Sequence, residues 1–291
     1  MKKILLSISA VVAMMTMTTL FTACSSDEER PSSPTLTIAA ARSDYNVSNT
    51  RAITADGDKI VTSWKTTDKV VVFKEGWTKE IGNLSPMEDS NNNVTKLDGS
   101  IQSGDLNVGD KMEFIMPRSK WEYTGQDGTI ETISSTYDYG IANVQITFFD
   151  QNKKVYGSDA YFKTQQAIVR YKLVDGSGNP LKAKSITIVS EKGQLVKSRS
   201  LDGKTVEHGG LEITPKNADT NVYYVAICDD SGAADKYTIT AKVDDKVYTS
   251  TSTRAQEYKK GDYVRHTVTM TVFDDTHTER DVYEDKGDVT W

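Results

Sequence analysis

Residues 263–272 read YVRHTVTMTV and carry the clearest secondary-structure signal in the chain. In an extended strand, successive side chains point to opposite faces. One face of this stretch would therefore hold Val264, His266, Val268, Met270 and Val272, and the opposite face is mostly threonine. This alternation predicts a long β-strand late in the fold.

Shorter runs of the same kind precede this strand along the chain. They include residues 70–73 (VVVF), 112–116 (MEFIM), 143–149 (NVQITFF), 167–174 (AIVRYKLV), 185–189 (SITIV) and 223–228 (YYVAIC). In residues 143–149 we expect Val144, Ile146 and Phe148 on one face. Turn-forming stretches such as residues 125–128 (GQDG) and 175–180 (DGSGNP) separate the runs. No convincing amphipathic helix follows the N-terminal signal described below, so we predict an all-β fold.

The pattern of strands and turns starts again near residue 164. The 240 residues after residue 51 are enough for two β-sandwich domains of roughly 100 residues or more each. We therefore expect an N-terminal sandwich at residues 52–164 and a C-terminal sandwich at residues 165–291.

Charge and cysteine content narrow the possible partners. The formal charge is −6, and it becomes −7 when residues 1–51, with five basic and four acidic side chains, are removed. A mildly acidic surface of mixed signs gives no electrostatic reason to bind nucleic acid. Cys24 and Cys228 are the two cysteines. If Cys24 carries lipid, Cys228 has no disulfide partner, and its apolar surroundings predict a small buried side chain.

The first 24 residues have the pattern of an export signal. Lys2 and Lys3 precede an apolar run at residues 4–20, and the small residues Thr22 and Ala23 then lead to Cys24. This looks like the lipobox of a bacterial lipoprotein, with a signal peptide at residues 1–23 and lipid on Cys24. The alternative is an uncleaved membrane anchor, because the run approaches the ~18 residues that span a bilayer. We favour the lipobox, since a spanning helix needs no cysteine at its boundary.

Residues 24–51 read as a tether that contains one strand. The acidic cluster at residues 25–29 (SSDEE) resembles a signal for the outer leaflet of the outer membrane, and a solvated linker has the same composition. Residues 35–41 (TLTIAAA) alternate Leu36 and Ile38 with threonine. Because a linker has no use for a buried face, we expect this pro-segment strand to dock into the folded part before it is removed.

An arginine that a protease could recognise follows this strand. Residues 48–52 (SNTRA) are polar and turn-prone, so a trypsin-like protease would reach Arg51 and leave Ala52 as the new N-terminus. Arg42 is a second candidate for the cut. An ordinary surface arginine is the other interpretation of either residue.

Together these features resemble the fimbrillin family, the lipoprotein-derived major and minor pilin subunits of type V pili. The resemblance covers most of the chain. It rests on the lipobox at Cys24, Thr50-Arg51-Ala52 ending 28 residues later, Trp64 followed by Asp68 and residues 70–73, Gly261-Asp262-Tyr263 before the late strand, and the final Trp291.

The resemblance implies two tandem transthyretin-like β-sandwich domains and a surface-exposed lipoprotein precursor on the cell outer membrane. An arginine-specific protease would cut after Arg51 and release the lipid together with the pro-segment strand. A strand from a neighbouring pilin subunit would then fill the vacant place, as in β-strand addition. Head-to-tail filling does not close on itself, so it would build a fimbria, as a homopolymer or a mixed fibre, that supports adhesion.

Two segments are candidates for the donated strand. One is residues 263–272, with Val264, Val268, Met270 and Val272 as its apolar side chains. The other is residues 281–291, with Val289 and Trp291. For residues 263–272 the competing interpretation is that the strand completes its own domain.

The sequence lacks the motifs of common enzymes and metal sites. His208, His266 and His277 have no metal-ligand spacing, and no nucleophile elbow or phosphate-binding glycine loop is present. The adjacent acids Asp229-Asp230, Asp244-Asp245 and Asp274-Asp275 lie in predicted turns, and neighbours on a strand point to opposite faces. We therefore expect no enzyme activity, no cofactor and no metal.

Two alternatives share the same fold. The chain would be a surface-exposed lipoprotein that binds glycans or another ligand, or an uncut anchor or tip subunit of a pilus. For glycan binding, exposed aromatic side chains would stack on sugars, and the candidates are Trp77, Trp121, Tyr123, Tyr137 and Tyr139. The other interpretation is that several of them belong to the core.

Overall fold

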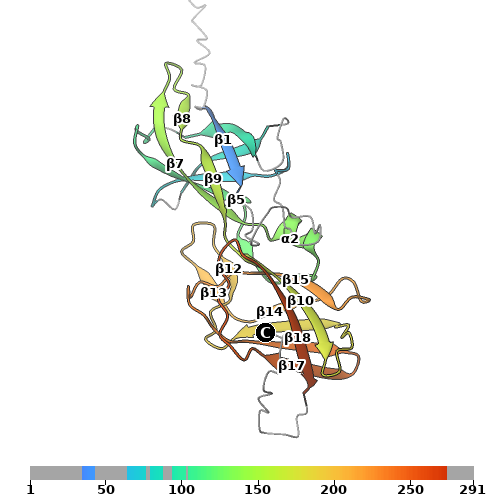
Figure 1. The fold of residues 1–291 in the computed structure, drawn as a ribbon. Coiled ribbons are helices and arrows are strands. Elements are labelled where there is room, and N and C mark those ends of the chain that lie inside the picture. The colour runs from blue at the N-terminus through green and yellow to red at the C-terminus, as the bar shows by residue number, and fades with distance from the viewer. Residues whose placement is uncertain (1–34, 43–63, 77–78, 88–93, 103, 274–291) are drawn as a thin grey trace, which may run out of the picture. The chain divides into compact units, whose positions relative to one another are not determined.

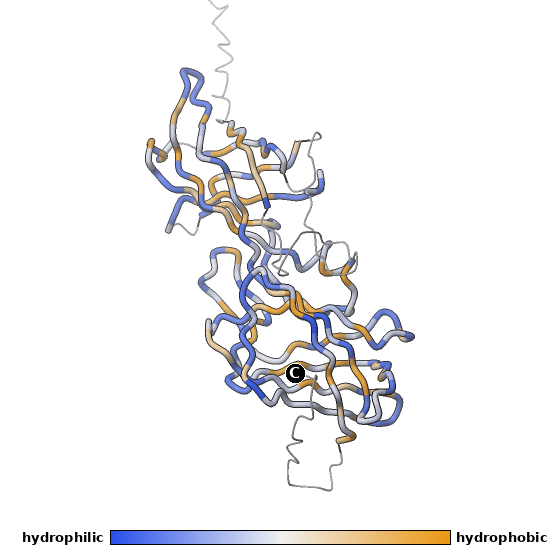
Figure 2. The backbone as a smooth tube through the Cα atoms, viewed as in Figure 1, coloured by the Kyte–Doolittle hydropathy of each residue, from blue (hydrophilic) through white to orange (hydrophobic). Residues whose placement is uncertain are grey.

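The computed structural model describes residues 35–42, 64–76, 79–87, 94–102 and 104–273 (Figure 1). In these residues almost all regular structure is β-strand, so the predicted all-β class is confirmed. The apolar segments, orange in Figure 2, run along the strands, and the connecting turns are mostly hydrophilic.

One short helix, α2 (Ile130–Thr136), lies among the described residues and corrects the expectation of none. Its first turn is held by side chains that accept hydrogen bonds from orphan backbone donors. Thr129 Oγ1 accepts from the N–H of Thr132 at 3.3 Å, and Asp127 accepts from the N–H of Thr129 at 3.0 Å. With seven residues, of which Ile130 and Ile133 are buried, the helix is too short to show a helical period in the sequence.

The first sheet closes on itself. It contains β1 (Thr35–Arg42), β2 (Val70–Lys74), β3 (Glu80–Pro86), β4 (Val94–Ile101), β5 (Lys111–Met116), β7 (Gly140–Phe149), β8 (Val155–Gly157) and β9 (Ala160–Thr164). The strands pair in the order β4-β3-β2-β5-β7, and β7 pairs with both β8 and β9. Since β1 pairs with β4 on one side and with β8 and β9 on the other, it joins the two ends of the sheet (Figure 1).

The closing strand β1 is paired over its whole length. It runs antiparallel to β4, from Thr35 opposite Ser100 to Ala41 opposite Val94, and parallel to β8 and β9. The strand expected at residues 35–41 is thus present and extends by one residue. Its inward side chains join the core of the ring, since Leu36, Ile38 and Ala40 are 0%, 4% and 2% exposed.

Gly99 on β4 lets the backbones of β4 and β3 approach closely. It lies opposite Leu36 of β1 and Leu84 of β3. A Cβ atom at residue 99 would lie 2.1 Å from the carbonyl oxygen of Asn83, a distance that no side chain tolerates. A glycine inside a strand often marks such an approach of another backbone.

Strands β2 and β5 bury side chains on both faces. Val70, Val72 and Phe114 belong to the core inside the ring. Val71, Phe73 and Ile115 belong to a second core, which they share with the strands that follow residue 164. This explains why the run at residues 70–73 is continuously apolar instead of alternating.

A second sheet begins with the strand after β9. It contains β10 (Ala167–Asp175), β11 (Ser185–Ser190), β14 (Leu211–Ile213), β15 (Val222–Ile227), β16 (Tyr237–Val243), β17 (Lys246–Thr251) and β18 (Tyr263–Val272), in the order β14-β11-β16-β17-β18-β10-β15. A small third sheet holds β6 (Trp121–Glu122), β12 (Val196–Arg199) and β13 (Val206–His208). Because β6 pairs with β12, residues before and after 164 are joined directly. The division into two domains at residue 164 stays a prediction.

Phe148 does not lie where the alternation predicts. Val144 and Ile146 on β7 are buried, but a register shift between Ile146 and Phe148 breaks the pairing with β8. An irregularity of this kind moves the following side chains to the other face. Phe148 is therefore 55% exposed, and its neighbour Phe149 packs against the core instead.

We predict that β1 contributes substantially to the stability of the uncut chain. Leu36→Ala should lower the free energy of unfolding by ~2–5 kcal/mol, because it removes a fully buried side chain and leaves a cavity. Thr35→Ala on the same strand is the control, since Thr35 is exposed. Denaturant unfolding of both variants measures the difference, and equal effects would show that β1 is not part of the core.

We also predict that residue 99 must be glycine. Gly99→Ala should destabilise the chain by about 1–3 kcal/mol, the usual cost of overpacking, because the backbone of β3 is in the way. Gly176→Ala is the matched control, since nothing lies within 4 Å of a Cβ atom at that position. A Gly99 variant as stable as the Gly176 variant would contradict the close packing of β3 and β4.

Candidate functional site

The place that β1 occupies in the ring, which we call the β1 slot, is the candidate functional site. The slot has β4 on one side and β8 and β9 on the other. Its inward positions are taken by Leu36, Ile38, Ala40 and Arg42, so two large aliphatic side chains are followed by a small one and then by a charged one. The slot is thus apolar at the Leu36 end and holds a charged side chain at the Arg42 end.

Arg42 ends the inward face with a buried ion pair. Its guanidinium contacts the carboxylate of Asp138, and the two side chains are each 7% exposed. The guanidinium also lies 5.5 Å from the centre of the Trp64 ring, within reach of a cation–π interaction. Removing one partner of a buried ion pair typically costs ~3–5 kcal/mol, because the other charge stays buried.

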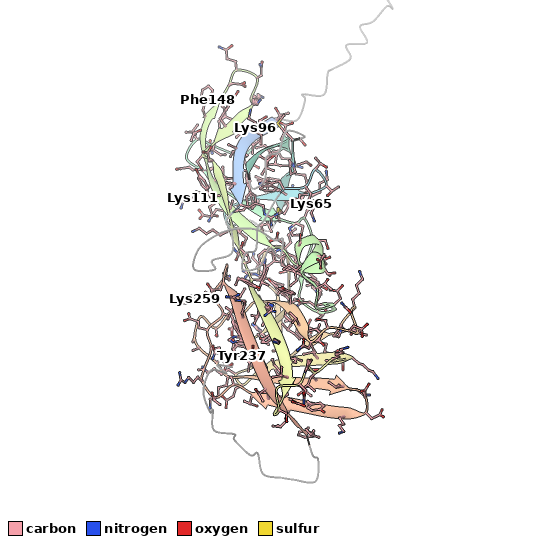
Figure 3. The ribbon with its side chains drawn as sticks, turned by 45° about the vertical axis from the view of Figure 1, so that its right-hand side comes forward. Lys65, Lys96, Lys111, Phe148, Tyr237 and Lys259 are labelled. Atoms are coloured by element: carbon pink, nitrogen blue, oxygen red, sulfur yellow. The ribbon has the colours of Figure 1, made fainter. Side chains whose placement is uncertain are left out.

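A cavity of about 420 Å³ adjoins this ion pair. Its lining includes Arg42, Lys65, Asp68, Arg118 and Asp138. Lys65, labelled in Figure 3, precedes β2, and its amino group donates to the carbonyl of Ser134 at 3.4 Å. Arg118 donates to both carboxylate oxygens of Glu80. Two of the neighbouring cations therefore have hydrogen-bond partners other than Asp138.

The pKa of Asp68, which lines this cavity, depends on the charge of Arg42 on β1. Burial raises the pKa of Asp68 above its usual value. The N–H of Lys65 donates to Asp68 at 2.9 Å, and this bond and the positive charge of Arg42 both oppose the rise in pKa. Loss of Arg42 would therefore raise the pKa of Asp68 further.

The late strand predicted from residues 263–272 is present as β18. It lies between β10 and β17 in its own sheet, and its alternation places His266, Val268 and Met270 in the interior. The ends are less covered, since Val264 is half-buried and Val272 is 53% exposed. In this chain β18 completes its own sheet, and its role as a donated strand stays a prediction.

Several predicted site residues lie outside the residues that the structure describes. They are the lipidation site Cys24, the processing site Arg51 and Ala52, and the second donor candidates Val289 and Trp291. The pro-segment residues Leu36 and Ile38 are described, and both side chains fill the β1 slot.

The aromatic platform expected for glycan binding is not formed by four of its five candidates. Trp121, Tyr123, Tyr137 and Tyr139 are buried in the second core, and Trp77 lies outside the described residues. Trp121 and Tyr139 stack with ring centres 5.3 Å apart. The pairing of β6 with β12 buries this region, and the sequence carries no local sign of that pairing.

Other aromatic side chains are exposed instead. Phe148, labelled in Figure 3, and Tyr156 on the paired strand lie with ring centres 5.6 Å apart, and both are exposed. Tyr161 on β9 is also exposed. Alternation along residues 143–149 predicted that Phe148 is buried. The register shift that exposes it has no signal in the sequence.

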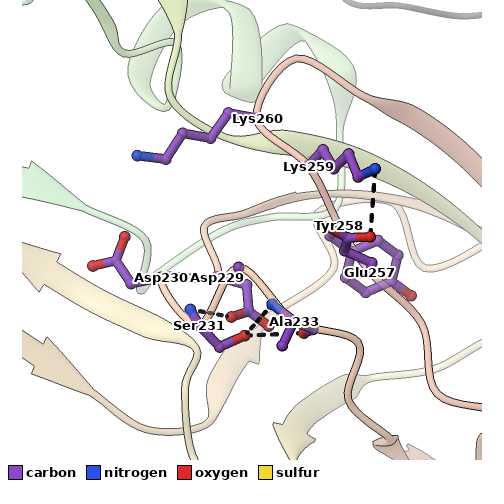
Figure 4. A pocket seen from close by; sticks show the side chains of 9 residues that line it. Asp229, Asp230, Ser231, Ala233, Glu257, Tyr258, Lys259 and Lys260 are labelled. Carbon is purple, nitrogen blue, oxygen red and sulfur yellow. Dashed lines mark hydrogen bonds and ion pairs between the residues drawn. The ribbon is translucent and has the colours of Figure 1, made fainter.

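A smaller cavity of about 250 Å³ lies between residues 229–233 and 257–260 (Figure 4). Its acids already have structural partners. Asp229 accepts hydrogen bonds from the N–H of Ser231 at 2.8 Å and the hydroxyl of Tyr237 at 2.5 Å, and Glu257 pairs with Lys259 at 3.4 Å. Asp229 thus acts as a turn residue, as its position in the sequence suggested.

The described residues offer neither a reactive thiol nor a metal-binding cluster. Burial raises the pKa of the Cys228 thiol to about 11, so the thiolate is scarce at neutral pH. Within the described ranges, no three His, Cys, Asp or Glu side chains form a group that could hold a metal ion. The described part of the chain also contains no helix with the length and apolar character needed to cross a membrane.

Comparisons with known proteins give similarities to solved structures only. No protein-family model matches the sequence, and no curated protein matches it. The chain is similar to a candidate cell adhesion protein from Bacteroides ovatus, with 15% identity over 83% of this chain and 95% of that chain and a TM-score of 0.45. It is also similar to a fimbrial assembly protein from Parabacteroides distasonis, with 13% identity over 83% of this chain and 99% of that chain and a TM-score of 0.41.

A third similar structure is that of candidate polysaccharide binding proteins from Bacteroides thetaiotaomicron. Its identity is 13% over 72% of this chain and 76% of that chain, with a TM-score of 0.39. Because all three TM-scores are below 0.5, neither a family nor a function follows from these similarities.

Proposed function

We propose that this chain is a structural subunit of a cell-surface fimbria, without enzyme activity, that supports adhesion. It is exported as a lipoprotein through Cys24, cut after Arg51 and polymerised when a neighbouring subunit replaces β1. The observation that carries the proposal is that β1, which belongs to the predicted pro-segment, closes the first sheet and fills its core.

Removal of β1 would leave two kinds of unsatisfied surface. The backbone groups of β4, β8 and β9 that face β1 would lose their partners, and an open sheet edge is a template for another strand. The core around Leu36 and Ile38 would be opened to water, at ~1.5–3 kcal/mol for each large apolar side chain that is lost. A strand from another subunit restores both, and head-to-tail filling extends into a fibre.

The burial of Arg42 supports the proposal that Arg51 is the processing site. Arg42 is 8% exposed, is paired with Asp138 and lies opposite Phe162 in the sheet. A protease must hold its substrate in an accessible extended segment, and Arg42 does not offer one while β1 is in place. A cut after Arg51 lies beyond the strand and would free all of β1.

The uncut alternatives keep β1 in the ring permanently. A ligand-binding surface lipoprotein is one of them, and an anchor or tip subunit is the other. The burial of four of the five aromatic candidates removes the main reason for proposing a glycan-binding surface. The first residue of the protein at the cell surface separates the cut form from the uncut forms.

We predict that Arg51→Ala abolishes both processing and assembly. The wild-type protein should be recovered with Ala52 as its first residue and as high-mass ladders that heat dissociates. The variant should stay lipidated and monomeric, because β1 still fills the slot. Arg254→Ala, at an exposed residue of the second part of the chain, is the control. Normal fibres from the Arg51 variant would refute the assignment of the cut.

We further predict that native protein resists cutting after Arg42. An arginine-specific protease should give a product that begins at Ala52, and no product that begins at Ser43, because Arg42 is buried and ion-paired. Mass spectrometry of intact digestion products measures this. Denatured protein is the control in which both bonds should be cut. Rapid cutting after Arg42 in the native protein would contradict the position of β1.

A further inference from the structure

We propose that Asp138 selects which strand fills the β1 slot, by requiring a basic side chain at the position that Arg42 now holds. The inference rests on the proposed function and names the chemistry of the partner. The partner strand should present alternating apolar side chains, the last of them small, followed by arginine or lysine.

The register of β1 shows what each position of the slot accepts. Leu36 lies opposite Gly99 on β4 and beside Val155 on β8, where a large side chain fits. Ala40 lies between Thr95 on β4 and Ala160 on β9, and all three are buried. The slot therefore holds large apolar side chains first and a small one next to the charged residue.

At the Arg42 end of the slot, two carboxylates lie near the position of the cation. Asp138 is almost fully buried beside the guanidinium of Arg42, and Gln166 Nε2 lies 3.5 Å from its carboxylate. Asp68 lines the same cavity and also responds to the charge of Arg42. A strand with a neutral residue at this position would leave the buried carboxylate without that cation, and an acidic residue would add a like charge.

The two donor candidates in this chain do not meet the requirement. Along β18, the inward series is Val264, His266, Val268, Met270 and Val272, which contains no arginine or lysine. In residues 281–291, the series that contains both Trp291 and Val289 continues in the reverse direction with Gly287 and Asp285. In the direction of β1, this series places Trp291 at the position of Arg42, and in the reverse direction it places Asp285 there. Neither direction brings a cation to Asp138. The geometry therefore points to a mixed fibre, in which a different chain supplies the strand.

The test measures strand exchange in the full chain after a cut at Arg51 in vitro. Labelled peptides compete with the bound pro-segment: the β1 sequence TLTIAAAR, its methionine-ended form TLTIAAAM, its lysine-ended form, and the peptides 263–272 and 281–291. Fluorescence anisotropy gives the affinity of each peptide. We expect the arginine peptide to bind at least tenfold more tightly than the methionine peptide, the lysine peptide to lie between them, and the two peptides from this chain to bind no better than the methionine peptide.

The same measurements on Asp138→Asn identify the group responsible. The preference for arginine should fall below about threefold in this variant and persist in the control Asp245→Asn, whose residue lies in the exposed turn between β16 and β17. Equal binding of the arginine and methionine peptides to the wild type would overturn the inference. A preference that persists in Asp138→Asn, or tight binding of peptide 281–291, would overturn it as well.

A second measurement needs no cut and no peptide. In the uncut chain, a double-mutant cycle of Arg42→Met and Asp138→Asn should show coupled effects on the unfolding midpoint, because the two side chains form one ion pair. Additive effects would count against selection by Asp138. If the cell does not cut Arg51, the proposed function fails while the peptide preference can still hold. If fibres form and the peptides show no preference, only this inference fails.

Discussion

Every strand at the end of a sheet exposes backbone donors and acceptors that need partners, and in the first sheet of this protein β1 satisfies both ends at once. It pairs with β4 on one side and with β8 and β9 on the other, although β4 follows it by more than 50 residues. The same strand supplies Leu36, Ile38 and Ala40 to the enclosed core. Backbone pairing and apolar burial in this sheet thus depend on one short segment close to the predicted lipid anchor.

Electrostatics adds a third dependence at the end of the strand. The buried carboxylate of Asp138 is paired with Arg42, and the ionisation of Asp68 responds to the same guanidinium. Apolar burial alone would accept many alternating strands, because it is non-directional. A buried charge is more selective, since it penalises every occupant that does not bring the opposite charge. The slot is therefore closed by apolar contacts and made specific by one ion pair.

Local patterns in the sequence predicted much of the fold, and pairings between distant residues account for what they missed. Alternation that places Leu36 and Ile38 on one face predicted the strand β1, and alternation that places Val268 and Met270 on one face predicted β18. These four side chains are buried, as expected. The partners of β1 are not encoded locally, and Arg42 is 96 residues away from Asp138. The sequence alone therefore did not predict that Asp138 lies at the Arg42 end of the slot.

The other errors have equally specific causes. The register shift in β7 turned Phe148 outward, and the pairing of β6 with β12 buried Trp121. Helix α2 depends on side-chain caps at Thr129 and Asp127, and it is shorter than two full helical periods. A backbone irregularity thus overrode the pattern at Phe148, a distant pairing decided between the two interpretations of Trp121, and α2 was missed because it is short.

Amide hydrogen exchange of β4 and β9 tests most directly whether β1 is the removable strand that closes the first sheet. In the uncut protein, the backbone amides of residues 95–101 and 160–164 that face β1 should be strongly protected. After a cut at Arg51 and release of the N-terminal fragment, these amides should exchange rapidly, and protection should return when a partner strand binds. Protection that survives the loss of β1 would show that the sheet is complete without it, and the account of assembly by strand replacement would then be wrong.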